Sequence, residues 1–148
     1  MTKEWSKRVL ARNLKAEDIH LDERWIDLRG TKTTSARRIV PIHKKIMPLV
    51  EKRINASGTG HIFLDAKGNR IVYNSYLKQF FTPMCEAFGL VHTPHECRHS
   101  FATYAAASKM NPILVKKILG HSAGDLTQDT YTHVMIEDLV AEIDKYTI

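Results

Sequence analysis

The chain has 148 residues, of which 43% are hydrophobic and 26% are charged, as in an ordinary globular domain with a hydrophobic core. The formal net charge of +6 and the pI near 9.4 favour a polyanionic partner, nucleic acid first. No stretch is apolar enough for a membrane span, and the N-terminus lacks the apolar region of a signal peptide. Cys85 and Cys97 have neither metal-site nor disulfide spacing, which predicts reduced thiols in a cytoplasmic protein.

The first third of the chain predicts a basic helix followed by a small antiparallel sheet. Residues 3–14 are expected to form the helix, and residues 15–22 a turn and a short strand. Strands are expected at 25–28 and 38–42, joined by a polar loop rich in cations, the pattern of a hairpin with a long basic tip. Pro41 places the second of these strands at a sheet edge, because proline has no N–H to donate.

The middle of the chain predicts a helix, a short strand and a turn. Apolar residues at helical spacing predict a helix over residues 43–55, although Pro48 is unfavourable inside a helix. A short strand is expected at 61–64, followed by a turn over 65–69.

Another helix is expected to begin at Asn74, to kink at Pro83 and to end at Gly89. Its side chains at helical spacing predict a face packed on the core. That face comprises Tyr76, Leu77, Phe80, Phe81 and Met84.

Three further helices are expected in the last third. Thr93 is a suitable N-cap for a helix over 94–108, because Pro94 fits the first helical position. Asn111 and Pro112 mark the start of the next helix, which ends before Gly120. An amphipathic helix over 136–146 closes the chain. The predicted fold class is therefore α+β, mainly α, with a small antiparallel β-sheet near the N-terminal part.

The start of the 94–108 helix concentrates polar side chains. His95 and Arg98 are three positions apart and should share a face. The free N–H groups of a helix N-terminus also favour anions. An imidazole, a guanidinium and a helix end together predict a phosphate site. The alternative is a capped, half-buried helix whose polar first turn faces water.

Four segments occur in an order and spacing that is specific as a set. They are Thr-Lys-Thr at 31–33 before Arg-Ile-Val-Pro-Ile at 38–42, His-x-x-Arg-His-Ser-Phe-Ala-Thr at 95–103, Leu-Gly-His-Ser at 119–122, and Thr-Tyr-Thr-His-Val at 130–134. With these segments, and Leu14 to Ile19 ahead of them, the chain resembles the catalytic domain of tyrosine recombinases, the phage integrase family. The resemblance covers nearly the whole chain.

The resemblance implies one catalytic domain over residues 1–148 that breaks and rejoins double-stranded DNA. Tyr131 would attack phosphorus and store the phosphodiester covalently. Arg98, His121 and His95 would stabilise the charge on the phosphate oxygens. By the same resemblance Lys32 would protonate the departing 5′ oxygen. No metal and no other cofactor is implied.

The chain departs from the family pattern at the first catalytic arginine. Arg8 is the candidate, but no Thr-Gly precedes it and Ala11 stands where the family has glutamate. We therefore expect the N-terminal side of the domain to be truncated and the family's N-terminal core-binding domain to be absent. We also expect a tetramer on DNA, formed by docking the C-terminal helix onto a neighbouring copy.

Two alternatives belong to other functional classes. The first is a non-catalytic, DNA-binding remnant of a recombinase. The second is a zinc protease, because residues 95–99 match His-Glu-x-x-His with His95 and His99 as ligands and Glu96 as base. Pro94 disfavours the zinc interpretation by placing the motif at a helix start. The sequence leaves a phage, a conjugative element and chromosome-dimer resolution open, with a mobile element preferred.

Overall fold

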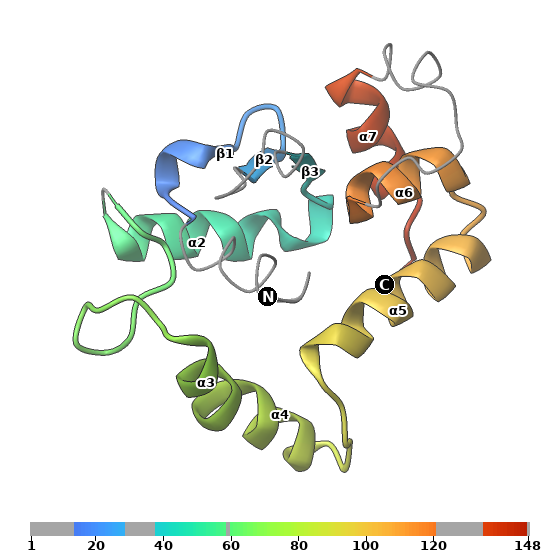
Figure 1. The fold of residues 1–148 in the computed structure, drawn as a ribbon. Helices are drawn as coiled ribbons and strands as arrows, with labels where there is room; N and C mark the ends of the chain where they lie inside the picture. Colours follow the sequence, from blue (N-terminus) through green and yellow to red (C-terminus); the bar gives the residue numbers. More distant parts are fainter. Residues whose placement is uncertain (1–13, 29–37, 59, 121–134, 148) are drawn as a thin grey trace.

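The computed structural model describes residues 14–28, 38–58, 60–120 and 135–147, drawn as the coloured ribbon in Figure 1. Within these ranges the chain is mostly helical and contains a three-stranded antiparallel sheet. This confirms the predicted α+β, mainly α class. The basic helix expected at the N-terminus and the tip of the hairpin lie outside the described residues. None of the described helices combines the length and apolar character that crossing a membrane requires.

The sheet consists of β1 (Ile19–His20), β2 (Trp25–Leu28) and β3 (Arg38–Pro41), in the order β1-β2-β3. A short 3₁₀ helix, η1 (Ala16–Asp18), precedes it. Pro41 of β3 pairs with Trp25 of β2. Strand β3 lies at the edge of the sheet, as the missing N–H of Pro41 predicted.

The helix expected from residue 43 divides into a 3₁₀ turn, η3 (Lys44–Ile46), and α2 (Met47–Ser57). His43 caps the start, its Nδ1 accepting a hydrogen bond from the Lys45 N–H at 3.1 Å. Pro48 lies in the first turn of α2, where its missing N–H leaves no helical bond unmade. The proline therefore sets the position at which the α-helix begins.

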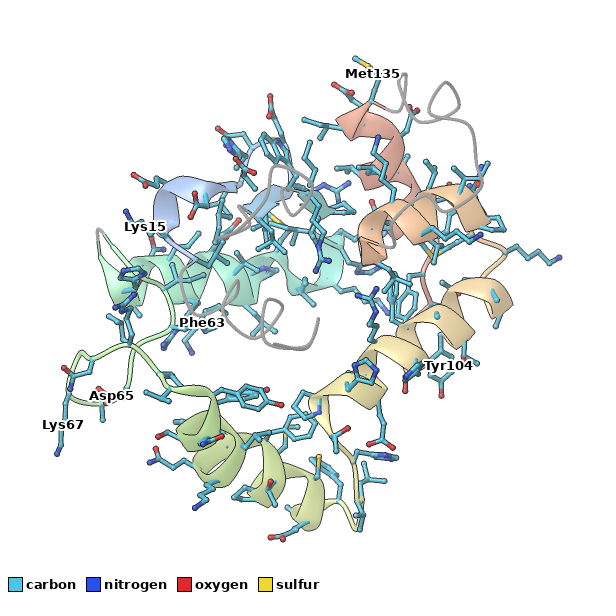
Figure 2. The ribbon with its side chains drawn as sticks, in the orientation of Figure 1. Lys15, Phe63, Asp65, Lys67, Tyr104 and Met135 are labelled. Atoms are coloured by element: carbon cyan, nitrogen blue, oxygen red, sulfur yellow. The ribbon has the colours of Figure 1, made fainter. Side chains whose placement is uncertain are left out.

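The strand expected at 61–64 is replaced by isolated bridges, in which His61 pairs with Lys15 and Leu64 with Arg70. A side chain takes the carbonyls that a neighbouring strand would use. Arg53 of α2 donates from Nε to the Ile62 oxygen at 2.7 Å and from Nη2 to the Leu64 oxygen at 3.0 Å. The turn that follows is confirmed, with Asp65 and Lys67 at its tip (Figure 2).

The single kinked helix expected from Asn74 is three consecutive segments. These are α3 (Tyr73–Tyr76), the π-helical η4 (Leu77–Phe81) and α4 (Thr82–Ala87). Pro83 explains the break, because it offers no N–H to the carbonyl four residues earlier. The residue after α4 is Phe88, and Gly89 adopts a left-handed φ of 67°, so the predicted end is confirmed.

The predicted packing of this segment is mostly wrong. Within its apolar face only Phe81 is buried, together with the neighbouring Cys85. Phe80 is 50% exposed and Met84 is 52% exposed. In Figure 1 the segment stands apart from the sheet, which explains why helical spacing did not lead to burial. Cys85 and Cys97 are both free thiols.

The last three helices are α5 (Pro94–Ala107), α6 (Pro112–Leu119) and α7 (Ile136–Ile143). The starts of all three match the sequence prediction, whereas α7 ends three residues early. Asn111 caps α6 by accepting the Ile113 N–H at 2.9 Å. These helices share one core cluster, against which Ile39 of β3 packs. Its buried members are Ala105, Met110, Val115, Ile118, Leu119, Leu139 and Ile143.

A second cluster lies between the sheet and α2. Its buried members are Leu14, Ile19, Ile42 and Ile62. Strand β3 contacts both α6 and α7, so it joins the two halves of the domain. In Figure 1 α2 lies on one side of the sheet and α6 and α7 lie on another.

The placement of α7 counts against the expected docking onto a neighbouring copy. Leu139 is 1% exposed and Ile143 is 6% exposed, both within the core of their own domain. Burying these side chains locally leaves α7 without a free apolar face to offer a partner. Self-association through this helix therefore stays a prediction, against which this burial counts.

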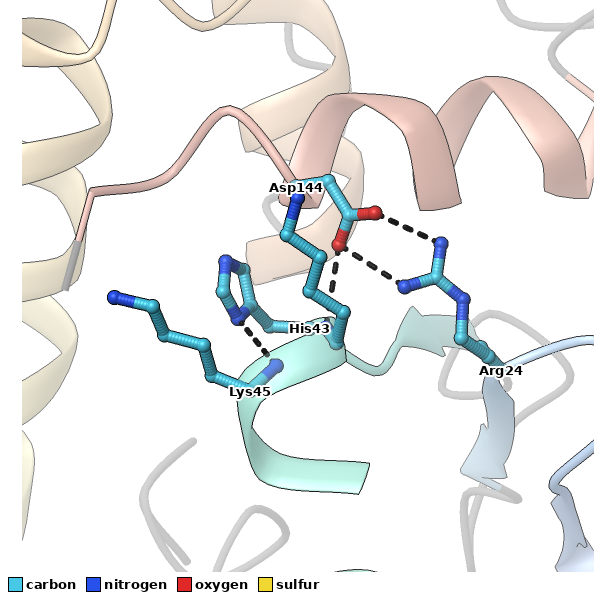
Figure 3. Close-up of polar contacts among 5 residues, drawn as sticks. Arg24, His43, Lys45 and Asp144 are labelled. Atoms are coloured by element: carbon cyan, nitrogen blue, oxygen red, sulfur yellow. Dashed lines mark hydrogen bonds and ion pairs between the residues drawn. The ribbon is translucent and has the colours of Figure 1, made fainter. Parts of the chain in front are cut away.

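Asp144, the residue after α7, connects this helix to the turn between β1 and β2 and to the start of η3 (Figure 3). Arg24 donates to it from Nη1 at 3.1 Å and from Nη2 at 2.9 Å, and the Lys44 N–H donates at 3.2 Å. The hydrogen bond from Arg24 is the main reason that the pKa of Asp144 lies below its ordinary value. The bidentate pair joins two segments that are 120 positions apart in the sequence.

Replacing Asp144 with asparagine is expected to lower the free energy of unfolding by about 1 kcal/mol at neutral pH. The folded-state pKa lies below the unfolded one, so the contribution is fully present above the unfolded pKa of about 4. It is lost as the pH falls through the folded pKa. Urea unfolding of both chains between about pH 2.5 and 7 measures this. A difference that stays constant over the whole range would contradict the prediction.

Candidate functional site

The first turn of α5 is held by a capping box. The Glu96 carboxylate accepts hydrogen bonds from the Thr93 backbone N–H at 2.5 Å and from the Thr93 hydroxyl at 3.0 Å. These bonds lower the pKa of Glu96 below its ordinary value. His92 lies 3.6 Å from the same carboxylate. Glu96 is therefore charged and occupied in fixing the start of the helix.

This geometry counts against the zinc-protease interpretation. His95 and His99 do lie together, with ring centroids 4.8 Å apart in an edge-to-face arrangement. Glu96, however, is a capping residue instead of a free general base. Across the described part of the chain, no group of three or more His, Cys, Asp or Glu side chains could hold a metal ion.

Arg98 lies one turn into α5, three positions after His95. His95 is exposed, whereas Arg98 is half-buried and its Nη2 is out of contact with solvent. That nitrogen has no hydrogen-bond partner among the described residues. Burial lowers the pKa of Arg98 from its ordinary value, yet a guanidinium stays protonated at neutral pH. A buried donor without a partner costs about 1–3 kcal/mol, so this nitrogen favours a bound acceptor.

Arg38 of β3 is a second guanidinium, within electrostatic reach of Arg98. Burial lowers the pKa of Arg38, and the positive charge of Arg98 lowers it further. Its Nη1 donates to the Leu119 carbonyl at 3.0 Å, while its Nε is buried without a partner within the described ranges. Two neighbouring cations that no described carboxylate neutralises make this region attractive to an anion.

The end of α6 closes around the Arg38 side chain. Gly120 has a left-handed φ of 64°, and a Cβ there would stand 2.8 Å from the Arg38 Cδ and closer still to its Nη1. A side chain at this position would therefore displace the arginine. Helix α6 contacts both β3 and α5 at this place in the fold.

The structure thus places three of the predicted segments next to one another. Strand β3 follows the loop that carries Lys32, α5 carries His95 and Arg98, and α6 ends two residues before His121. Lys32, His121, Tyr131 and Arg8 themselves lie outside the described residues. Their predicted positions in the site stay predictions.

Known proteins are similar to this chain in sequence and in fold. The model of the phage integrase family matches residues 10–137, which is most of the chain. The chain belongs to the phage integrase family. The matched range includes the four segments between residues 31 and 134 and begins after Arg8.

Curated members of the family are similar along most of this chain. Tyrosine recombinase XerA of Pyrococcus horikoshii is 28% identical, over 90% of this chain and 47% of its own length. Tyrosine recombinase XerC of Pelobacter propionicus is 29% identical, over 73% of this chain and 37% of its own length. The integrase-family chain therefore spans about half the length of the curated relatives it matches.

Solved structures confirm the fold. An integrase from mycobacterium phage Brujita superposes with a TM-score of 0.71 at 21% identity, covering 95% of this chain and 47% of its own. The XerA recombinase gives 0.66 at 23% identity, covering 88% and 49%. The integrase of transposon Tn1549, solved with transposon right end DNA, gives 0.66 at 21% identity, covering 93% and 54%.

Proposed function

We propose that this chain is the catalytic part of a site-specific recombinase that breaks and rejoins double-stranded DNA through a 3′-phosphotyrosyl intermediate. The observation that carries the proposal is Arg98, a half-buried guanidinium with an unpartnered donor beside a second cation. Such a cluster has the charge and hydrogen-bonding capacity for a phosphodiester. Membership of the phage integrase family and the similar tyrosine recombinases support the same reaction.

In the proposed step the Tyr131 oxygen attacks phosphorus and forms a new P–O bond to the 3′-phosphate. The bond from phosphorus to the 5′ oxygen breaks, and Lys32 supplies the proton that the departing oxygen needs. Arg98 and His121 stabilise the negative charge on the non-bridging oxygens, and His95 assists as donor or proton acceptor. Attack by a 5′-hydroxyl reverses the step, so the phosphodiester energy is conserved and no nucleotide cofactor is needed.

Double-stranded DNA is the proposed partner. The net charge of +6 favours it, and the similar Tn1549 integrase was solved in complex with DNA. Binding should weaken as salt rises, because each phosphate contact releases counterions. Assembly of several copies on DNA is also proposed, through a surface other than the buried face of α7.

A pool of nicked duplexes with randomised sequence tests the proposal whatever the DNA site is. Incubation with the chain, followed by denaturation in SDS, should leave DNA covalently attached. Trypsin should then release residues 118–145, a peptide whose one tyrosine is Tyr131, carrying a nucleotide after nuclease treatment. Sequencing the captured DNA gives the site.

Two results would contradict the proposal. An adduct on a different peptide would reject Tyr131 as the nucleophile. Salt-dependent DNA binding with no adduct at any sequence would instead favour the non-catalytic, DNA-binding remnant. The weak match around Arg8 is the observation that keeps this second candidate in view, because the loss of one charge donor typically slows such a reaction by about 10²–10³.

A further inference from the structure

A structural role alone does not account for the position of Arg38. Only its Nη1 is used within the described residues, to bind the Leu119 carbonyl at the end of α6. The Nε of Arg38 is buried without a partner among the described residues. The positive charge of Arg98 also disfavours the positive charge of Arg38. A neutral donor could hold the carbonyl without this repulsion.

The residues around Arg38 accommodate its side chain in this energetically unfavourable position. Gly120 leaves room for the Arg38 stem, and a Cβ there would meet it at 2.8 Å. The Nε of Arg38 and the Nη2 of Arg98 are both out of contact with solvent and both lack partners among the described residues. One anion could accept hydrogen bonds from both groups and relieve the repulsion between them.

We propose that Arg38 and Arg98 together bind one phosphodiester group, and that the contact with Leu119 holds Arg38 in place for this role. The inference deepens the proposed function and rests on it for the identity of the anion. It gives β3 a part in the site that is separate from the loop carrying Lys32. The competing account is that Arg38 only pins α6 to the sheet.

Inorganic phosphate is the probe, and the thermal midpoint of unfolding is the readout. Phosphate is compared with chloride at equal ionic strength, and only the saturable part of the rise in Tm is scored, since phosphate also stabilises proteins non-specifically. The wild-type chain should show a saturable rise. Arg38→Gln and Arg98→Gln should each lose most of it.

Arg53→Gln is the matched control. Arg53 also donates to backbone carbonyls, but it does so from α2 beside the other core cluster. This variant should lower the baseline Tm and keep the phosphate response. Arg38→Lys serves if Arg38→Gln does not fold: it keeps one charge, but a single ammonium cannot reproduce the planar fork, so its response should be reduced.

Gly120→Ala tests the same inference without changing a charge. The added Cβ should displace Arg38 and reduce the phosphate response. Gly89→Ala is its control, because Gly89 also has a positive φ at a helix end but has open space around it. That variant should keep the response.

An Arg38→Gln chain that keeps the wild-type phosphate response would overturn the inference, and so would a wild-type chain with no saturable rise. The proposed function is judged separately, by the DNA adduct on Tyr131. Arg38-dependent phosphate binding without any adduct would reject the proposed reaction alone. An adduct together with an Arg38-independent phosphate response would reject the inference alone.

Discussion

Replacing Arg98 with glutamine is expected to lower the rate of covalent DNA adduct formation by a factor of about 10²–10³. Glutamine keeps a hydrogen-bond donor and much of the stem but removes the charge and the forked geometry that match a phosphate. The rate is measured under single-turnover conditions, on the DNA sequence recovered from the adduct selection. Tyr131→Phe, which removes the proposed nucleophile, sets the background of the assay.

The same substitution should leave the free energy of unfolding unchanged or raise it. Arg98 has a buried donor without a partner among the described residues, and it repels Arg38, so its removal relieves two unfavourable contributions. Arg53→Gln should behave in the opposite way, lowering stability while changing the adduct rate only a few-fold. If Arg98→Gln instead destabilised the chain and left the rate intact, Arg98 would be a structural residue.

The sequence predicted best those elements whose signals are local. Asn111 caps α6 and Gly120 follows its last residue, so both ends were placed correctly. Thr93 and Pro94 marked the start of α5 in the same way, and in the structure Thr93 and Glu96 hold that start by reciprocal hydrogen bonds. Pro41 marked an edge strand, because the constraint belongs to the proline itself.

The sequence patterns did not predict the contacts between segments that are distant in the chain. The strand expected at 61–64 failed because Arg53 binds two of its carbonyls. Helical spacing in the segment from Tyr73 to Ala87 correctly suggested helix but not its exposure, because periodicity does not identify what covers a face.

The candidate site was only partly predictable for the same reason. Arg98 stood out through its motif, whereas Arg38 was one cation among several near a basic loop. Its importance depends on a contact with Leu119 that spans 81 positions of sequence. Gly120 was predicted only as the end of α6, whereas in the structure it is required by both its positive φ and the nearby arginine.

Replacing Leu139 with alanine is expected to lower the free energy of unfolding by about 2–5 kcal/mol. Leu139 is 1% exposed and lies among buried residues of α5 and α6 as well as α7, so its truncation leaves a cavity that the cluster cannot readily fill. Urea unfolding measures the change, and the midpoint should fall with little change in slope. Leu49→Ala makes the same chemical change on α2, where the side chain is 66% exposed, and should stay within about 0.5 kcal/mol of the wild type.

The dependence of the unfolding midpoint on protein concentration distinguishes packing of α7 within its own chain from docking of α7 onto a neighbouring copy. If Leu139 packs within its own chain, the unfolding midpoint of the wild type and of Leu139→Ala should each be independent of concentration. If α7 docked instead onto a neighbouring copy, stability would follow mass action and the wild-type midpoint would rise with concentration. Leu139→Ala would then weaken association more than folding. A concentration-dependent midpoint in the wild type, lost in Leu139→Ala, would support the docking of α7 onto a neighbouring copy, against which its buried face now counts.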